Sequence, residues 1–219
     1  MEYPVNELYA TIQCEATHTG VPAVFVRIQG CNVGCGWCDQ KKTWSLNKDN
    51  EVPATEVLAD RAKPEQYALM SVGDILQKVA LKAPIGHVVI TGGEPAWFNL
   101  EPLTSALSEK GYFVQVETSG VYDIRVHPKT WVTLSPKQTP QGTTKLKAIT
   151  RANEIKFIIK DEKDLARVKK LDEAFAIPSS LVWLQPLSQC EDATKLCINA
   201  AIRNGWRFSV QAQKYLDIR

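Results

Sequence analysis

Three cysteines stand close together in the N-terminal part of the chain: Cys31, Cys35 and Cys38, separated by three and then two residues. Sulfur ligands at this spacing bind zinc or an iron–sulfur cluster, and the glycines between them let the backbone wrap closely around an inorganic core. Three local thiolates can ligate three irons of a four-iron four-sulfur cluster and leave the fourth iron open. The loop therefore predicts either a structural metal site or a reactive cluster.

The structural alternative for this loop is a closed zinc knot, which needs four ligands. Cys14 would then supply the fourth thiolate, because the chain has no second Cys-x2-Cys pair and no paired histidines. In that case the chain would be a noncatalytic, zinc-stabilised binding protein. A disulfide is disfavoured because we expect the chain in a reducing compartment.

Strand-like and helix-like stretches alternate along the chain and position this loop. Apolar runs rich in β-branched residues predict strands at 23–28, 87–91, 112–116, 131–134, 154–159, 181–184 and 206–210. Apolar residues at helical spacing predict helices at 71–81, 100–107, 161–171 and 192–202. The alternation indicates an α/β fold: a parallel sheet with helices outside it, closed or partly open as a barrel. Functional loops of such folds follow the C-terminal ends of strands, as the cysteine loop does.

The length of 219 residues fits one domain, so we expect a single domain over 1–219. Residues 40–70 interrupt the alternation because they are rich in Lys, Asp, Glu, Asn and Pro. We interpret this segment as an insert or a mobile surface segment of that domain.

Composition excludes several classes of protein. Hydrophobic residues make up 44% of the chain, but no apolar run is long enough for a membrane span, which excludes a membrane enzyme. The near balance of 26 Lys and Arg against 24 Asp and Glu leaves little net field for a polyanion, so we expect no direct nucleic-acid partner. The first residues lack the basic and apolar regions of a secretory signal, so we expect a cytoplasmic protein with reduced thiols.

The cysteine loop resembles the signature of the radical S-adenosylmethionine (SAM) enzymes, including an aromatic residue, Trp37, before the last cysteine. In those enzymes Cys-x3-Cys-x2-Cys binds a 4Fe-4S cluster whose open iron chelates the amino and carboxylate groups of SAM. The segment 91–95, Thr-Gly-Gly-Glu-Pro, resembles their glycine-rich segment that contacts the SAM amino group, although Gly92-Gly93 alone would indicate only a tight turn. The resemblance implies a partial β/α barrel of the radical SAM type.

Over nearly the whole chain the sequence is similar to one family of these enzymes, the 7-carboxy-7-deazaguanine synthases. The shared marks are Asn6-Glu7, Ile12-Gln13-x-Glu15, Gly20 to Ala23, Arg27, the cysteine loop, the segment 91–95, Glu117 to Gly120, Leu134 to Lys137, Asn153 to Lys156 and Leu184 to Ser188. The resemblance implies a lyase in which the 5′-deoxyadenosyl radical abstracts a hydrogen from 6-carboxy-5,6,7,8-tetrahydropterin. Ring contraction with loss of ammonia then gives 7-carboxy-7-deazaguanine, on the way to queuosine-type nucleosides.

The same resemblance implies roles for individual residues. Cys31, Cys35 and Cys38 would ligate the cluster and are the predicted catalytic residues. The SAM site would be lined by Trp37, Cys38, Asp39, Gly93, Ser135, Pro136, Lys137, Gln185, Pro186, Leu187 and Ser188. The pterin would meet Ile12, Gln13, Cys14, Arg27 and Thr91. The planar fork of donors on Arg27 suits the substrate carboxylate. For Glu117 and Lys137, an ordinary surface or structural pair is the alternative on residue type alone.

The chain departs from the family pattern on the substrate side. Gln13-Cys14-Glu15-Ala16 stands for Gln-Gly-Glu-Gly, and a Cβ obstructs the close approach and positive φ that glycine permits. Gln40 stands for a threonine that helps bind Mg²⁺ in the family; an amide oxygen also suits magnesium, but on a longer stem. Gln211-Ala212-Gln213-Lys214 stands for Gln-x-His-Lys. A radical SAM enzyme for a different heterocycle or a protein partner is therefore the alternative within enzymes.

The resemblance also implies a homodimer and a flavodoxin-type reductant. Dimerisation would cover the sheet edges that a short barrel leaves open. Lys41 and Lys42 are expected in a solvated loop, where their charge would favour an acidic flavodoxin near the cluster.

Overall fold

The computed structural model describes residues 1–59 and 62–218. Its main sheet has nine strands in the spatial order β11-β10-β9-β6-β5-β4-β2-β1-β3, and β7 and β8 form a small second sheet. The strands are β1 (Glu2–Ile12), β2 (Pro22–Ile28), β3 (Ala68–Ser71), β4 (His87–Gly92), β5 (Phe113–Thr118), β6 (Trp131–Leu134), β7 (Gln138–Thr139), β8 (Gly142–Thr143), β9 (Glu154–Ile159), β10 (Val182–Pro186) and β11 (Arg207–Phe208). Pairing is parallel from β2 to β11 and antiparallel where β1 joins β2 and β3.

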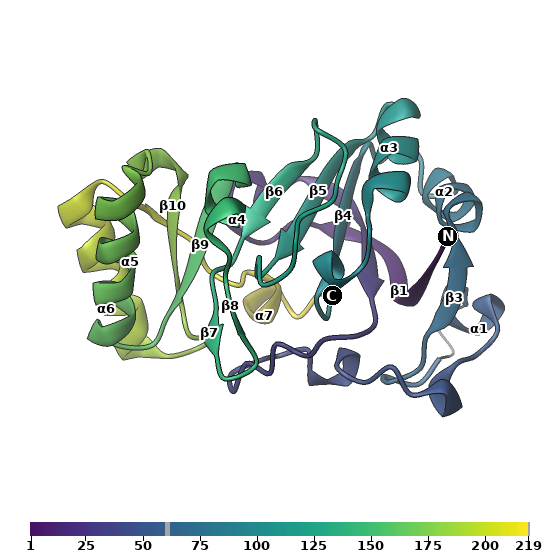
Figure 1. Ribbon diagram of the computed structural model, residues 1–219, viewed down its shortest axis with the longest axis horizontal. Coiled ribbons are helices and arrows are strands. Elements are labelled where there is room, and N and C mark those ends of the chain that lie inside the picture. Colours follow the sequence, from purple (N-terminus) through teal and green to yellow (C-terminus); the bar gives the residue numbers. More distant parts are fainter. Residues whose placement is uncertain (60–61, 219) are drawn as a thin grey trace.

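Helices cover this sheet at both ends. The α-helices are α1 (Ala54–Leu58), α2 (Val72–Ala80), α3 (Glu101–Glu109), α4 (Leu146–Arg151), α5 (Glu162–Phe175), α6 (Glu191–Asn204) and α7 (Gln213–Leu216). The 3-10 turns are η1 (Ala16–His18), η2 (Lys41–Thr43), η3 (Lys48–Asn50), η4 (Pro95–Trp97) and η5 (Ser179–Leu181). Figure 1 shows α2 and α3 toward one end of the sheet and α5 and α6 at the other. The predicted α/β partial barrel, with a parallel sheet and outer helices, is confirmed.

Two hydrophobic cores lie under these helices. The first gathers Val26, Ile90 and Leu103 with their neighbours, and the second gathers Val168 and Leu184. Burial of these aliphatic side chains is the main favourable term that holds helices against the sheet. The sheet itself therefore acts as a rigid frame for the loops at its strand ends.

Local chemistry sets several helix boundaries. Ser71 and Asp74 form a capping box at the start of α2, and the Asp161 carboxylate caps α5. Gly205 ends α6 with a φ of 69°, a conformation that glycine adopts without a steric penalty. These signals define the starts of α2 and α5 and the end of α6, within the regions where apolar spacing predicts helices.

Two strands of the main sheet, β1 and β3, were not predicted, nor were β7 and β8 of the small sheet. The strand β1 contains Pro4, Asn6 and Glu7, which lower strand propensity, yet it pairs with β2 and β3 on its two sides. The strand β3 begins within the segment 40–70, ends at Ser71 and forms one edge of the main sheet, so part of that segment is built into the sheet. Residues 60 and 61 of the segment lie outside the described residues.

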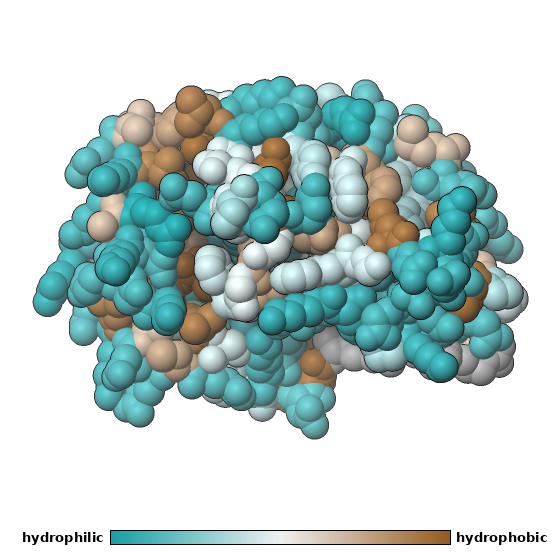
Figure 2. All heavy atoms as spheres, turned by 60° about the horizontal axis from the view of Figure 1, so that its bottom comes forward, coloured by the Kyte–Doolittle hydropathy of each residue, from teal (hydrophilic) through white to brown (hydrophobic). Residues whose placement is uncertain are grey.

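Large apolar side chains gather in the cores rather than on the visible surface. Figure 2 turns the bottom of Figure 1 toward the viewer and shows a mostly hydrophilic face with small hydrophobic patches. Over residues 1–59 and 62–218, no helix is long and apolar enough to cross a membrane.

Candidate active site

One pocket of about 720 Å³ collects side chains from strand ends and the loops that follow them. Of the residues predicted for the site, the pocket is lined by Ile12, Gln13, Cys14, Arg27, Cys31, Cys35, Trp37, Cys38, Asp39, Gln40, Thr91, Gly93, Ser135, Lys137, Gln185, Pro186, Leu187 and Ser188. Pro136 is not among the residues that line it. The fold therefore brings nearly all the predicted residues into a single cavity, of the size typical for small-molecule ligands.

Strand register explains why these side chains meet. In the parallel pair of β2 and β4, Arg27 lies opposite Thr91, and in the pair of β5 and β6, Glu117 lies opposite Thr133. Parallel strands in register carry side chains at equivalent positions to the same edge of the sheet. The C-terminal edge thus receives its polar residues from several strands at once.

The three loop cysteines line this pocket as free thiols. The backbone N–H of Gln40 and the indole N–H of Trp44 donate to Cys38 Sγ over 3.3 and 3.4 Å. Burial raises the pKa of Cys31 to about 11 and also raises the pKa of Cys35, so metal ligation must release their protons. Three thiols beside N–H donors to sulfur are a donor set that fits an iron–sulfur cluster.

The same donors do not form a site for a single metal ion. Within the described parts of the chain, no three His, Cys, Asp or Glu side chains are grouped to hold one ion. Cysteines of a 4Fe-4S cluster bind separate irons, so they need not gather around one point. The Cys14 thiol, which the zinc knot requires as fourth ligand, donates instead to the Ile12 carbonyl over 3.4 Å.

Glu94 connects two of the sequence motifs beside the cysteine loop. Its carboxylate accepts from Thr118 Oγ1 over 2.5 Å, from the Ser119 backbone N–H over 2.9 Å, and from the Ser119 hydroxyl. A Cβ on Gly93 would lie only 2.3 Å from the carbonyl oxygen of Gly30. Glycine is therefore required here by the close approach of the segment 91–95 to the cysteine loop, beyond any role in a turn.

Lys137 faces the cysteine side of the pocket. Its Nζ donates to the Ser135 carbonyl over 3.0 Å and to the Ser135 hydroxyl over 2.5 Å. Burial lowers the pKa of Lys137, and the nearby Cys35 partly opposes that shift. The alternative of an ordinary pair between Lys137 and Glu117 is not what the structure shows, because the carboxylate of Glu117 pairs with Lys156.

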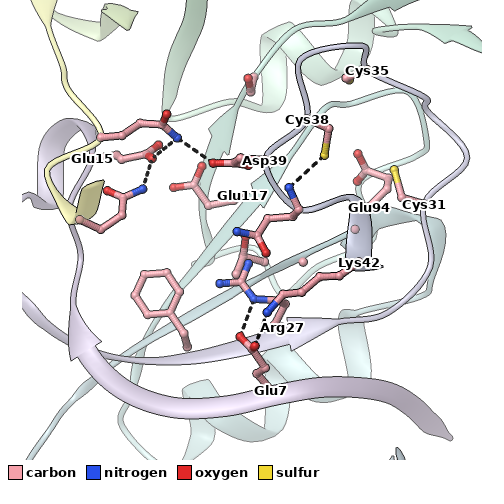
Figure 3. A pocket seen from close by; sticks show the side chains of 18 of the residues that line it. Glu7, Glu15, Arg27, Cys31, Cys35, Cys38, Asp39, Lys42, Glu94 and Glu117 are labelled. Carbon is pink, nitrogen blue, oxygen red and sulfur yellow. Dashed lines mark hydrogen bonds and ion pairs between the residues drawn. The ribbon is translucent and has the colours of Figure 1, made fainter. Parts of the chain in front are cut away.

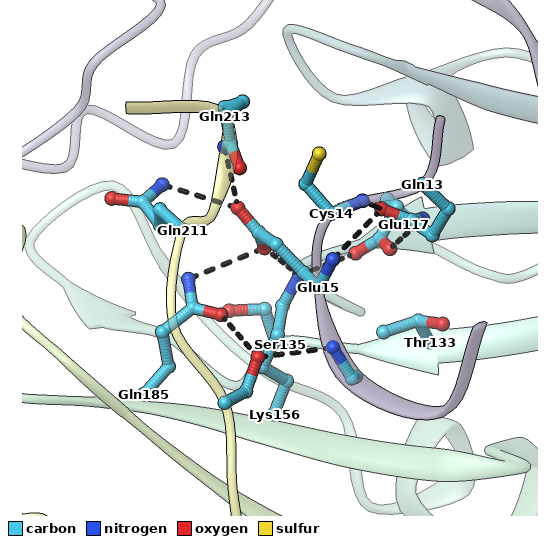
Figure 4. Close-up of polar contacts among 12 residues, drawn as sticks. Gln13, Cys14, Glu15, Glu117, Thr133, Ser135, Lys156, Gln185, Gln211 and Gln213 are labelled. Carbon is cyan, nitrogen blue, oxygen red and sulfur yellow. Dashed lines mark hydrogen bonds and ion pairs between the residues drawn. The ribbon is translucent and has the colours of Figure 1, made fainter. Parts of the chain in front are cut away.

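Glu15, Glu117 and Lys156 form what we call the acidic wall of the pocket (Figure 4). Lys156 pairs with both carboxylates, and its Nζ lies 2.9 Å from Glu117 Oε2. Glu15 also accepts hydrogen bonds of 3.2, 3.2 and 2.9 Å from three amides: Gln185, Gln211 and Gln213. Burial opposes ionisation of Glu15, yet Lys156 and the amides hold its pKa at about 2. For Glu117, burial prevails and raises the pKa.

Arg27, Lys42 and Glu7 form a second charged group, which we call the cationic corner (Figure 3). Arg27 Nε donates to Glu7 Oε2 over 3.0 Å, and Arg27 Nη2 donates to the Tyr9 hydroxyl over 2.7 Å. Lys42 pairs with the other oxygen of Glu7, and its side chain is 31% exposed. The expectation of a solvated loop therefore holds for Lys41 but is wrong for Lys42, which lines the pocket.

Some residues of the pocket had no role in ligand binding assigned from the sequence, notably Lys42, Lys156 and Gln213. For Lys156 a signal existed: a lysine inside the apolar strand 154–159, since ionisable residues are rarely buried without a partner. Gln213 stood out only as a departure from the family pattern at 211–214; its contact with Glu15 depends on the tertiary fold.

Comparison with known proteins places the chain in a class. The family model of the radical SAM superfamily matches residues 25–138, which include the cysteine loop and the segment 91–95. The chain therefore belongs to the radical SAM superfamily, whose enzymes use a 4Fe-4S cluster and SAM.

Full-length relatives narrow this assignment. The chain is 43% identical to 7-carboxy-7-deazaguanine synthase from Escherichia coli (strain K12) and 39% identical to that from Buchnera aphidicola subsp. Schizaphis graminum, each over 100% of both chains. The crystal structure of QueE from Escherichia coli matches with a TM-score of 0.90 and 42% identity, covering 96% of this chain and 94% of that chain. The chain belongs to the 7-carboxy-7-deazaguanine synthase family.

Proposed function

We propose that the chain contracts the ring of 6-carboxy-5,6,7,8-tetrahydropterin to 7-carboxy-7-deazaguanine with release of ammonia, in the biosynthesis of queuosine-type 7-deazaguanines. Beyond family membership, one observation carries the proposal. A single pocket presents the cysteine loop, the cationic corner and the acidic wall. A carboxypterin has a carboxylate that suits the cationic corner and ring N–H donors that suit the acidic wall, so its polarity matches that of the pocket.

Cys31, Cys35 and Cys38 would hold the cluster, which together with SAM supplies the 5′-deoxyadenosyl radical. The residues that support a SAM site are those lining the pocket near the loop: Trp37, Asp39, Gly93, Ser135, Lys137, Pro186, Leu187 and Ser188. Pro136, which lies between Ser135 and Lys137 in the chain, would belong to the same SAM site. The side chain of Gln185 contacts the acidic wall instead, since its amide donates to Glu15. The side chains that line the pocket would keep water away from the radical.

On the substrate side, Ile12, Cys14 and Thr91 would contact the pterin beside Arg27, which would bind its carboxylate. Gln13 connects Cys14 with the acidic wall: its Oε1 accepts from the Cys14 N–H over 2.8 Å, and its Nε2 donates to Glu117 Oε1 over 3.3 Å. Glu117, whose pKa is raised by burial, is the carboxyl on the acidic wall that takes up a proton more readily than Glu15.

Gln40 is the residue that we propose for Mg²⁺. Its amide oxygen is buried and has no hydrogen-bond partner among the described residues, and the residue lines the pocket. Amide oxygens are suitable ligands for this hard cation.

We further propose that residues 1–219 form a single cytoplasmic domain that acts as a homodimer. The edge strands β3 and β11 and the exposed apolar pair Ile198 and Ile202 on α6 support dimerisation. The exposed residues Trp37 and Lys41 near the cysteine loop support electron delivery there by a flavodoxin-type protein.

The experiment that tests the function starts from anaerobically reconstituted protein, with iron, sulfide and zinc measured. We expect about four irons per chain, an absorption band that bleaches with dithionite, and formation of 7-carboxy-7-deazaguanine and ammonia from the carboxypterin. Cys35→Ser serves as control and should lose the product. A protein that cleaves SAM but leaves the pterin unchanged would point to another heterocycle or a protein substrate. A colourless protein with stoichiometric zinc would contradict radical chemistry altogether.

A further inference from the structure

Lys42 is placed where a positive charge faces the substrate pocket. It belongs to η2, which follows the cysteine loop, and its ammonium pairs with Glu7 of β1. Arg27 of β2 approaches the other oxygen of the same carboxylate over 3.0 Å. Figure 3 shows Arg27 and Lys42 converging on Glu7 below the cysteine loop. Two cations from separate segments are thus held side by side by one acidic residue.

Among residues 1–59 and 62–218, the protein partners of the two cations do not use all of their N–H donors. A guanidinium has five N–H donors and an ammonium has three. Arg27 uses donors on Nε and Nη2 for Glu7 and Tyr9, and Lys42 donates to Glu7. The remaining donors of both side chains are available to a ligand in the pocket that they line.

The charge of the cationic corner is not balanced by its own members. Two positive charges, on Arg27 and Lys42, face one negative charge on Glu7. Their side chains are 11%, 31% and 22% exposed, so solvent only partly stabilises the excess. Burying an uncompensated charge is costly, and an anionic ligand group would lower that cost.

The acidic wall determines how a ligand is oriented in the pocket. Glu15 and Glu117 share one ammonium, so that side of the pocket attracts donors and repels a carboxylate. A ligand carrying a carboxylate therefore places it toward Arg27 and Lys42.

We propose that Lys42 binds the substrate carboxylate together with Arg27, and that Glu7 is a positioning residue that holds the two cations beside each other. This inference rests on the proposed function, since it takes the carboxypterin as substrate. It assigns a binding role to a residue that differs in environment from its neighbour Lys41, which is exposed. The role does not depend on Mg²⁺, because the ammonium is itself the counter-charge.

The test measures binding rather than turnover. Reconstituted holoenzyme with SAM and without reductant is titrated with 6-carboxypterin, an oxidised analogue, and with pterin, which lacks the carboxylate. Lys42→Met should weaken binding of 6-carboxypterin by about tenfold or more and leave pterin binding within about twofold. Lys42→Arg should restore most of the affinity, and Lys41→Met is the matched control that should bind like the wild type. The pattern should be the same with EDTA and with added Mg²⁺.

The outcomes separate this inference from the proposed function. If the wild type prefers 6-carboxypterin to pterin and Lys42→Met keeps that preference, the role of Lys42 is overturned and the function stands. If Lys42→Met weakens both compounds equally, Lys42 has only a structural role and the inference is likewise overturned. If the wild type does not distinguish the two compounds, carboxypterin recognition itself fails, and the inference fails with it.

Discussion

Lys156 and Glu117 are joined across two strands that are not neighbours in the sheet: Lys156 Nζ on β9 lies 2.9 Å from Glu117 Oε2 on β5. Their side chains are only 6% and 16% exposed. Glu15 shares the same ammonium from a third segment. Two carboxylates thus depend on one cation, so its removal has consequences for both.

We expect Lys156→Met to lower the free energy of unfolding by about 3–5 kcal/mol, because it leaves two buried carboxylates without their counter-charge. Urea denaturation measures this loss. The matched control is Lys145→Met, which breaks an exposed pair with Asp123 and should change the stability far less. Adding Glu117→Gln to Lys156→Met should recover part of the stability. Equal effects of the two lysine substitutions would contradict the buried pairing.

The stability of the protein is expected to depend on pH through a histidine cluster that includes His87, the first residue of β4. His18 and His87 lie 5.2 Å apart, between ring centroids, in a cluster with Phe113 and Trp131. Burial lowers the pKa of His87 to about 4, and His18 adds to the shift. The unfolded chain therefore binds a proton between about pH 6.5 and pH 4 that the folded chain does not. The contribution of neutral His87 to the free energy of unfolding should be fully present above about pH 6.5. It should fall by up to about 3 kcal/mol as the pH drops toward 4.

Denaturation curves of the wild type and His87→Gln, recorded at neutral and at acidic pH, check this dependence. In His87→Gln, the free energy of unfolding should depend much less on pH. In His127→Gln, which lies outside the cluster, it should depend on pH as in the wild type. An unchanged slope in His87→Gln would assign the acid sensitivity to other groups.

Ala16 has a φ of 56°, a left-handed conformation that an alanine adopts at a cost of about 1 kcal/mol or more. Its backbone is held there by a 2.9 Å hydrogen bond from its N–H to Ser209 Oγ. We expect Ala16→Gly to raise the thermal stability, by about 1 kcal/mol. Ala10→Gly, in the extended strand β1, is the control and should destabilise the protein. A loss of stability in both variants would argue against strain at Ala16.

Gln40→Thr should increase the stimulation of turnover by Mg²⁺, because a hydroxyl on a short stem replaces an amide oxygen on a longer one. The ratio of rates with Mg²⁺ and with EDTA is the measurement. Lys41→Thr, next in the chain and exposed, should respond like the wild type. If the ratio of rates is the same in Gln40→Thr and in the wild type, residue 40 does not bind the magnesium ion.

The sequence was most informative where a signal is local. The strands 131–134 and 154–159 coincide with β6 and β9, because short runs of β-branched and aromatic residues mark buried parallel strands. β11, predicted over 206–210, spans only Arg207–Phe208, and β1 and β3 were missed. Those edge and antiparallel elements owe their strand conformation to their partners in the sheet more than to their own residues.

The superfamily chemistry could be read from the residue order, because the spacing of Cys31, Cys35 and Cys38 and the glycines at 92–93 are local features of a few residues. The pairing of charges, in contrast, depends on the fold. Glu15 lies 141 residues from Lys156 in the chain, and Lys42 lies 35 residues from Glu7, yet each pair is in contact. Hydrogen bonds and ion pairs depend on distance in space, which folding sets and residue order alone does not reveal.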